Sequence, residues 1–336
     1  MRHSMLQGSA RKATALWYTA PGIVELREET LTCPPPDAVL VGTLFTAVSR
    51  GTERLIAKGQ VPETERERMR APFMAGAFPF PVKYGYAAVG KVEEGPPNWL
   101  NRSVFVLHPH QDLFWAPVQA VVPVPEDIPL ARAVLAANME TALNAVWDAA
   151  PGPADRIAVV GGGVVGSLVA WLCASLAGTQ VTLIDIDPSR AVIAEALGFS
   201  FAVPESAEGN CDLVVHASGT SDGLACALRL AGQEATVLEL SWYGTNAVAI
   251  PLGEAFHSRR LKLISSQVGH VAPSHRARWT SRDRLEAALA LLSDARLDVL
   301  IAPAIEFRDL PMRLPEILFD AGGALCPLVS YGASRQ

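Results

Sequence analysis

The stretch Arg156–Gly166, with the sequence RIAVVGGGVVG, decides how this chain folds. An apolar run of strand length leads into glycines that satisfy the spacing GxGxxG through Gly161, Gly163 and Gly166. Gly161 permits a tight turn from strand to helix, Gly163 lets a pyrophosphate approach the backbone, and Gly166 lets the helix pack closely on the sheet. The stretch therefore predicts a strand, a glycine turn and a buried helix.

The residues that follow the turn make a dinucleotide site the favoured interpretation over an ordinary tight turn. The free N–H groups at the start of the helix, at Val164 and Val165, are expected to hold negative phosphates. Asp185 ends the next strand, 19 residues beyond Gly166. An acid at this place is the expected partner of the adenosine ribose hydroxyls.

Two acids close together bear on the choice of cofactor. Asp185 and Asp187 would repel a 2′-phosphate about 4 Å away by on the order of 4 kcal/mol at an effective dielectric of 20. We therefore expect NAD(H) rather than NADP(H), although Arg190 would offset part of this repulsion. The alternative for Asp187 is that it caps the helix that starts near Pro188.

The distribution of strand and helix patterns along the sequence predicts an α/β protein with two domains. Residues 13–128 contain short strands broken by proline and glycine, which predicts a small β-barrel or sandwich. From Pro129 onward strands alternate with helices, which predicts a doubly wound parallel sheet. The tail is too short to stand alone and is expected to rejoin the first domain. We expect a barrel domain from residues 1–138 and 268–336, and a dinucleotide-binding domain from residues 139–267.

Composition excludes several classes of protein. Half of the 336 residues are apolar, 18% are charged, and the net charge is −6 without a basic block, so we expect neither nucleic-acid nor membrane binding. Residues 157–184 carry no charge, but glycines interrupt this run, and a strand, a turn and a buried helix have the same hydropathy. The five cysteines form no CxxC pair, which favours a reducing, cytoplasmic setting.

The whole pattern resembles the medium-chain dehydrogenase/reductase superfamily. The stretches that carry the resemblance are Gly85–Val92 (GYAAVGKV), Val159–Gly166, Asp185–Gly198, Asp212–Gly219 (DLVVHASG) and Thr236–Gly244 (TVLELSWYG). Within the superfamily, the stretch SRGTE at residues 49–53 and the stretch GYAAVGKV are most similar to the branch that contains the bacteriochlorophyllide dehydrogenases.

The resemblance implies a GroES-like catalytic barrel, a Rossmann domain, a deep cleft between them and a homodimer formed through the cofactor domain. It also implies nicotinamide contacts from three segments that follow the Rossmann strands, at residues 217–219, 241–243 and 265–267. The residues expected to make these contacts are Ser218, Ser241, Trp242 and Ser266.

The positions that hold catalytic zinc in such relatives carry other residues here. Aligning the conserved turns puts Arg50 at the first ligand position, Tyr86 at the histidine position and Ala137 near the third; a slip of one residue would bring Ser49 to the first. None of these is a thiolate or imidazole, and a guanidinium cannot bind a cation. The resemblance therefore points to a zinc-independent member with no metal.

Without zinc, preorganised side-chain donors must stabilise the charge that develops during hydride transfer. Tyr86 and Arg50 are the candidates, since an adjacent guanidinium would lower the phenol pKa from about 10. Thr52 aligns with the hydroxyl that relays a proton in zinc-containing relatives. The alternatives are that Thr52 caps a helix and that Arg50 pairs with Glu53 or another acid and fills the former metal position.

Two further groups are candidates for the substrate cleft. His110 belongs to the motif HPH, whose alternative is a surface loop with a hydrogen-bonded histidine. Arg278 and Trp279 belong to a basic stretch that could receive an anionic group or stack on a flat ring. Arg282 and Arg284, further along, are expected to be solvated.

The sequence thus predicts an NAD(H)-dependent oxidoreductase that acts on an alcohol or carbonyl in a small-molecule substrate. The first alternative is an NADPH-dependent quinone or enoyl reductase, as many zinc-free relatives are. The second is a dinucleotide-binding sensor whose catalytic residues have decayed.

Overall fold

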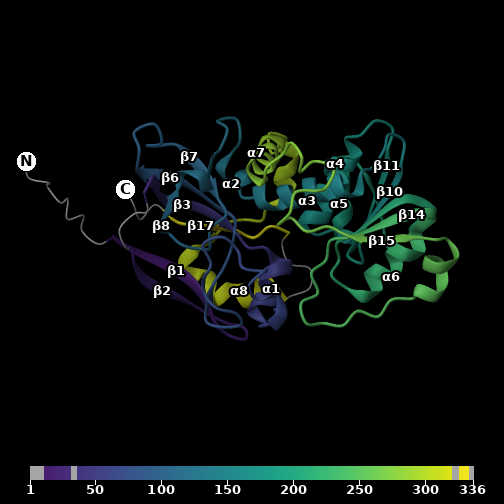
Figure 1. Ribbon diagram of the computed structural model, residues 1–336, viewed down its shortest axis with the longest axis horizontal. Helices are drawn as coiled ribbons and strands as arrows, with labels where there is room; N and C mark the ends of the chain where they lie inside the picture. Colours follow the sequence, from purple (N-terminus) through teal and green to yellow (C-terminus); the bar gives the residue numbers. More distant parts are fainter. Residues whose placement is uncertain (1–10, 32–35, 320–324, 333–336) are drawn as a thin grey trace, which may run out of the picture.

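The computed structural model describes residues 11–31, 36–319 and 325–332. Figure 1 shows a parallel sheet at one end of the molecule and the mixed strands of a barrel at the other. The order in the parallel sheet is β12-β11-β10-β13-β14-β15, and every pair is parallel. Its strands are β10 (Arg156–Val160), β11 (Gln180–Ile184), β12 (Ser200–Ala202), β13 (Cys211–His216), β14 (Ala231–Glu239) and β15 (Lys262–Ser265).

This order is that of a doubly wound sheet, in which the first strand, β10, lies in the middle and the chain continues to either side of it. Alternate residues of β10 face opposite layers. Val159 joins a core with helices α3 (Ala136–Ala149), α4 (Val164–Ala174) and α5 (Ala191–Leu197), whereas Val160 joins a core with α6 (Ser221–Leu230). The prediction of a doubly wound α/β fold is confirmed.

The barrel end consists of two sheets, β2-β1-β5-β4 and β16-β17-β3-β6-β7-β9, with β8 paired to β3. The chain returns to it late, because β17 pairs antiparallel with β3. The boundaries predicted at residues 138/139 and 267/268 remain a prediction. The strands are β1 (Arg11–Ala20), β2 (Ile23–Leu31), β3 (Ala38–Ala47), β4 (Ala75–Gly76), β5 (Val82–Lys83), β6 (Ala88–Glu94), β7 (Ser103–Val106), β8 (Leu113–Pro117), β9 (Val121–Pro123), β16 (Ile305–Glu306) and β17 (Leu328–Ser330).

The remaining helices lie on and between these sheets (Figure 1). They are α1 (Arg50–Ala57), α2 (Leu130–Ala133), α7 (Ser281–Leu291) and α8 (Leu310–Phe319), with the short turns η1 (Glu63–Glu65), η2 (Val118–Ala120), η3 (Pro188–Arg190), η4 (Leu252–Phe256), η5 (Ala295–Leu300) and η6 (Phe307–Asp309). Within the described ranges, no helix has both the length and the apolar character needed to span a bilayer. The uncharged run at residues 157–184 forms β10, the glycine turn, α4 and β11.

The expectation that Arg284 is solvated is wrong. Its side chain is 2% exposed because α3 and the segment before α7 close over the guanidinium. Arg284 pairs with Glu140 at 3.0 Å, donates to Asn144 Oδ1 at 2.5 Å, and donates to the carbonyls of Val268 and His270. One buried cation thereby joins α7, α3 and the chain that leaves β15.

Replacing Arg284 by alanine would leave the carboxylate of Glu140 buried without its partner. We expect Arg284→Ala to lower the free energy of unfolding by about 3–5 kcal/mol. Urea unfolding followed by circular dichroism measures this change. Arg276→Ala is the matched control, because Arg276 is exposed and such surface changes shift stability by about 0.5 kcal/mol or less. Equal effects of the two substitutions would contradict the assignment.

Candidate functional site

Of the three glycines that satisfy the motif, two are packed tightly and one is open. Gly161 has φ +111°, and a Cβ there would lie 2.6 Å from the backbone nitrogen of Ser218. A Cβ on Gly166 would lie 1.9 Å from the carbonyl oxygen of Gly161, so α4 can start here only with glycine. A Cβ on Gly163 would meet nothing within 4 Å. The turn therefore leaves open space in front of the start of α4.

The start of α4 offers backbone donors to that space. Gly163 is the N-cap residue and is exposed, and no side chain caps the helix. Val164 and Val165, the first helical residues, are half-buried. Exposed N–H groups at the positive end of a helix are suited to holding a phosphate.

Asp185 and Arg190 lie on the same side of the glycine turn. The Asp185 carboxylate accepts from the N–H of Gly162 at 2.6 Å and from the N–H of Asp187 at 2.9 Å. Arg190 side-chain carbons lie 3.2–3.3 Å from where a Cβ of Gly162 would be. Asp187 caps the turn η3 by accepting from the N–H of Ser189, and hydrogen bonds from the Ser189 side chain and from this N–H lower the pKa of Asp187. Asp187 is thus the helix cap that the alternative interpretation described.

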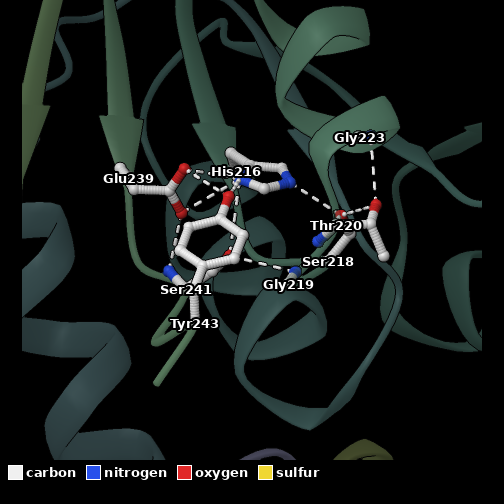
Figure 2. A network of polar contacts seen from close by, with 8 residues as sticks. All are labelled: His216, Ser218, Gly219, Thr220, Gly223, Glu239, Ser241 and Tyr243. Atoms are coloured by element: carbon white, nitrogen blue, oxygen red, sulfur yellow. Dashed lines mark hydrogen bonds and ion pairs between the residues drawn. The ribbon is translucent and has the colours of Figure 1, made fainter. Parts of the chain in front are cut away.

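A polar network joins the ends of β13 and β14 (Figure 2). His216 and Glu239 are the last residues of these strands and are paired in register. His216 Nδ1 lies 2.7 Å from the Glu239 carboxylate, and His216 Nε2 lies 2.6 Å from Ser218 Oγ. The Ser241 N–H and the Tyr243 hydroxyl also donate to Glu239, at 2.7 and 3.0 Å.

The network fixes the charge states of two of its members. Burial raises the pKa of Glu239, but hydrogen bonds from His216 and Ser241 more than offset burial and hold that pKa below its usual value. Burial, together with the neighbouring Glu239, raises the pKa of Tyr243 well above its ordinary value. Glu239 is therefore a carboxylate and Tyr243 a neutral donor at physiological pH.

Sequence reasoning missed His216 and Glu239, whereas Tyr243 lies in the segment 241–243 that is expected to contact the nicotinamide. The available signal was a polar residue at the last position of two apolar strands, in the stretches DLVVH and TVLEL. Such residues at the carboxyl ends of parallel strands lie where ligands bind in doubly wound sheets.

The four serine and tryptophan residues predicted to contact the nicotinamide have different surroundings. Ser218 belongs to the network, and Ser241 Oγ accepts from the N–H of Gly219 at 3.0 Å. Trp242 packs against an apolar cluster of the barrel end that also contacts Tyr86. Ser266 donates to Asp148 of α3 at 2.6 Å, so its hydroxyl is tied to that helix. Their contacts with a cofactor remain a prediction.

A cluster of hydroxyls occupies the barrel side, at the start of α1. The Tyr86 hydroxyl donates to Ser49 Oγ and lies 3.1 Å from Thr52 Oγ1. Burial raises the pKa of Tyr86 above its ordinary value of about 10. Arg50 Nε instead donates to the carbonyl of Ile317 on α8 at 2.8 Å. The expectation that Arg50 lowers the Tyr86 pKa is wrong, because Ser49 rather than Arg50 faces the phenol.

The helix-cap alternative for Thr52 and the pairing of Arg50 with Glu53 are also not what the structure shows, whereas the pairing of Arg50 with another acid remains a prediction. Ser49 is the N-cap of α1, and Thr52 is inside the helix. Glu53 is fully buried and accepts from the Ser49 N–H at 2.7 Å and from the Tyr18 hydroxyl at 2.5 Å. Its remaining partner is His110 Nε2, at 3.2 Å. The carboxylate of Glu53 thus fixes the start of α1 through its hydrogen bond with the N-cap residue Ser49.

The interpretation of the HPH motif as a surface loop is wrong. His110 is 1% exposed, and its ring nitrogens contact Glu53 and Thr46, so it lies beneath the hydroxyl cluster rather than lining a cleft. His108 stacks on Phe114 with ring centroids 3.6 Å apart, and burial lowers the pKa of His108 to about 3. Both histidines are core residues because β8 follows them and folds back on β3.

Trp279 and Arg278 lie beside the end of α3. Trp279 is half-buried with its edge against Trp147 at 5.1 Å, and Trp147 stacks on His275 at 4.0 Å. Arg278 is exposed. Their role in a substrate cleft remains a prediction.

The residues at the hydroxyl cluster do not fit a zinc ion. Zinc in proteins takes thiolate, imidazole or carboxylate ligands. The hydroxyls of Ser49 and Tyr86 are hydrogen-bonded to each other. Glu53 accepts a hydrogen bond from Tyr18, and His110 forms one with Thr46. Across the parts of the chain that are described, no three side chains of His, Cys, Asp or Glu gather as a metal site would require.

The two halves of the candidate site meet through the loop after β14. The Thr245 N–H donates to the carbonyl of Gln60 at 3.1 Å, and a Cβ on Gly244 would lie 2.3 Å from the same oxygen. Gln60 follows α1, whose first turn carries Thr52. The loop that begins with Ser241 therefore docks on the helix that carries the hydroxyl cluster.

Comparison with solved structures agrees with this architecture. The chain is similar to a putative zinc-binding dehydrogenase from Sinorhizobium meliloti bound to NADP, with 18% identity, TM-score 0.75 and coverage of 95% of this chain and 99% of the other. It is also similar to L-idonate 5-dehydrogenase from Escherichia coli (13%, TM-score 0.78, 96% and 99%) and to 2R,3R-butanediol dehydrogenase from Bacillus subtilis (16%, TM-score 0.75, 95% and 100%). No protein-family model and no curated protein matches the chain. At these identities the likeness shows that the chain shares their fold.

Gly163 separates a ligand role from a packing role. We expect Gly163→Ala to change the free energy of unfolding by about 1 kcal/mol or less, because its Cβ has space and its φ is ordinary. We expect the same change to weaken NADH binding at least about tenfold, since a methyl group would stand where the pyrophosphate approaches. Calorimetric titration measures the affinity. Gly253→Ala, at another open glycine, is the control, and unchanged affinity in Gly163→Ala would contradict the assignment.

Proposed function

We propose that this chain is an NAD(H)-dependent oxidoreductase of the medium-chain dehydrogenase/reductase type that works without zinc on an alcohol or carbonyl substrate. One juxtaposition carries the proposal. The open glycine turn, with Asp185 beside it, follows a strand of the parallel sheet. A loop that leaves the same sheet docks on α1, near the hydroxyls of Tyr86, Thr52 and Ser49. A phosphate-binding turn and a proton-transferring group are the two parts that this chemistry needs.

The residues at the turn fit a dinucleotide. The start of α4 would hold the pyrophosphate, Asp185 would accept from the adenosine ribose hydroxyls, and Arg190 would cover the adenosine end. Among the similar structures one is described as bound to NADP and another, from E. coli, as complexed with NADH. Preference for NAD(H) rests on the carboxylate of Asp185, which would repel a 2′-phosphate.

A bound nicotinamide would supply the hydride acceptor or donor. In the oxidation direction the substrate carbon loses a hydride, its hydroxyl loses a proton, and a carbonyl remains. In the reverse direction, reduction of a carbonyl, the oxygen gains a proton, and Tyr86 would supply it. Because its pKa is raised, Tyr86 stays a neutral phenol that can donate to the alkoxide formed by hydride addition, and the phenolate left behind would take a proton from solvent, while Ser49 and Thr52 hold the phenol in place. Hydroxyl donors thereby replace the electrophile that zinc provides in other members.

One observation favours the reductase alternative. Arg190 packs directly over Gly162, on the side of Asp185, where a guanidinium could reach a 2′-phosphate. Tighter binding of NADPH than of NADH would support an NADPH-dependent quinone or enoyl reductase. A cytoplasmic location and a small-molecule substrate remain part of the proposal.

We also propose that the chain forms a homodimer through β15. Within the described part of the chain, β15 ends the parallel sheet, and all four of its residues are exposed. Leu263 and Ile264 are 36% and 37% exposed, and Leu252 nearby in sequence is 44% exposed. An exposed edge strand with apolar side chains has unpaired backbone N–H and C=O groups on one side and is suited to pairing with a second copy.

Tyr86→Phe tests the chemical step. We expect the substitution to lower kcat by about 100-fold, because the phenol proton is lost, and to leave the Kd for NADH within about twofold. Turnover is followed by nicotinamide absorbance with a panel of primary and secondary alcohols and carbonyls. Tyr84→Phe, an adjacent tyrosine whose ring contacts Tyr86, is the control. Intact turnover in Tyr86→Phe removes the phenol from the mechanism, and no wild-type turnover on the panel would favour a sensor.

The dimer is tested by molar mass. We expect size-exclusion chromatography with light scattering to give twice the chain mass for the wild type and a single chain for Leu263→Lys/Ile264→Lys, since two buried ammonium groups would oppose the interface. Leu100→Lys, at an exposed leucine of the barrel end, should remain dimeric. A monomeric wild type would refute this interface.

A further inference from the structure

A pocket lies at the amino ends of β13 and β14, at the opposite edge of the parallel sheet from the glycine turn. It has a volume of about 350 Å³ and is lined by Gly209, Asn210, Arg229, Gly232, Gln233 and Arg259. The strand β13 has 6 residues, so its two ends are about 16 Å apart at about 3.3 Å per residue. The pocket is therefore separate from the candidate site, which lies at the carboxyl ends of the strands.

An irregularity in β14 forms one wall of this pocket. Cys211 of β13 pairs with Ala231 of β14. The next pair is Leu213 with Thr236, so the chain advances farther along β14 than along β13 between the two pairs. The additional residues of β14, 232–235, form a bulge, which interrupts the ladder of hydrogen bonds. Two residues of this bulge line the pocket.

Backbone carbonyls hold the two arginines of the pocket in place. Arg229 Nη2 donates to the carbonyl of Pro204 at 2.7 Å. Arg259 Nη1 donates to the carbonyls of Ala231 and Arg229 at 2.7 and 3.2 Å. Each guanidinium uses one nitrogen for these bonds, and its Nε and other Nη have no acceptor among the described residues. A fixed guanidinium with unused donors is suited to binding two oxygens of an anion at once.

Neither Arg229 nor Arg259 forms an ion pair within the described parts of the chain. By contrast, the neighbouring Arg260 pairs with Glu234 at 3.2 Å. The residues that line the pocket include no acid. Arg229 is exposed and Arg259 is half-buried, so a small molecule has access to both. The pocket therefore offers two positive charges to one occupant.

A second pocket, of about 320 Å³, adjoins the first and shares both arginines with it. The rest of its lining is mainly apolar and consists of Ala225, Leu228, Pro251, Ala255, Ser258 and the exposed acid Glu254. An anionic group held between the arginines could thus carry an apolar body into this second pocket.

We propose that Arg229 and Arg259 bind a phosphate group at this edge of the sheet. Two guanidinium groups match the oxygens of a phosphate, and the side-chain amides of Asn210 and Gln233 offer neutral donors. The phosphate would join the end of α6, the bulge of β14 and the segment before β15. The site does not depend on the proposed function, because none of its residues belongs to the glycine turn or to the hydroxyl cluster.

Calorimetric titration with inorganic phosphate and with phenyl phosphate tests this site. NADH is present in excess, since under the proposed function it occupies the start of α4, and sodium chloride keeps the ionic strength constant. We expect both phosphates to bind the wild type. We expect Arg229→Gln and Arg259→Gln each to weaken binding by about tenfold or more, because each removes hydrogen bonds to a charged group. Tighter binding of phenyl phosphate identifies an organic phosphate as the ligand, and equal affinities identify the free ion.

Arg260→Gln is the matched control, because this exposed arginine lines neither pocket. Arg229→Lys and Arg259→Lys keep the charge but lose the planar fork, so we expect intermediate affinities. The lysine variants also replace a glutamine variant that does not fold, and thermal melting without phosphate establishes folding. No binding of either phosphate to the wild type, unchanged binding in either glutamine variant, or an equal loss in Arg260→Gln overturns the assignment of this site.

Discussion

The contact between Gly166 and the carbonyl of Gly161 is the constraint on which the rest of the structure depends. With no Cβ at Gly166, the first turn of α4 lies directly against the end of β10. This approach places the helix start at the centre of the sheet, between β11, which leads to Asp185, and the strands that carry His216 and Glu239. A side chain at position 166 would move α4 away from β10. The start of the helix would then be separated from Asp185 on one side and from His216 and Glu239 on the other.

Local patterns were enough to predict the strand, the glycine turn and the helix at the centre of the parallel sheet, but not α1, β12 or α8. The apolar run of β10, the glycine spacing and the acid after β11 are all readable within 30 consecutive residues, and each has a local physical cause. His216 and Glu239 are 23 residues apart and meet only because β13 and β14 pair in that register. Arg284 and Glu140 are farther apart still. Burial of such charges follows from packing between distant segments, which no local pattern records.

The barrel side shows how sensitive such predictions are to a shift of one residue. Successive residues on a helix point about 100° apart. Arg50 and Ser49 therefore cannot both face Tyr86. The alignment predicted that Arg50 faces the phenol, but Ser49 does so and the Arg50 guanidinium points toward α8. The chemistry changes with it, because a neutral hydroxyl beside the phenol replaces a cation. The position of the α1 N-cap, which sets this rotation, depends on the buried carboxylate of Glu53.

The two sides of the candidate site differ in the charge that they carry. On the barrel side burial and the nearby Glu53 raise the pKa of Tyr86, so no phenolate forms to carry charge there. An anion developing on a substrate oxygen beside Tyr86 would find a hydroxyl proton rather than a fixed cation, and proton transfer must accompany hydride transfer. On the sheet side the fixed charge is the carboxylate of Glu239. Under the proposed function, the proton chemistry is then set on the barrel side, where the substrate would bind.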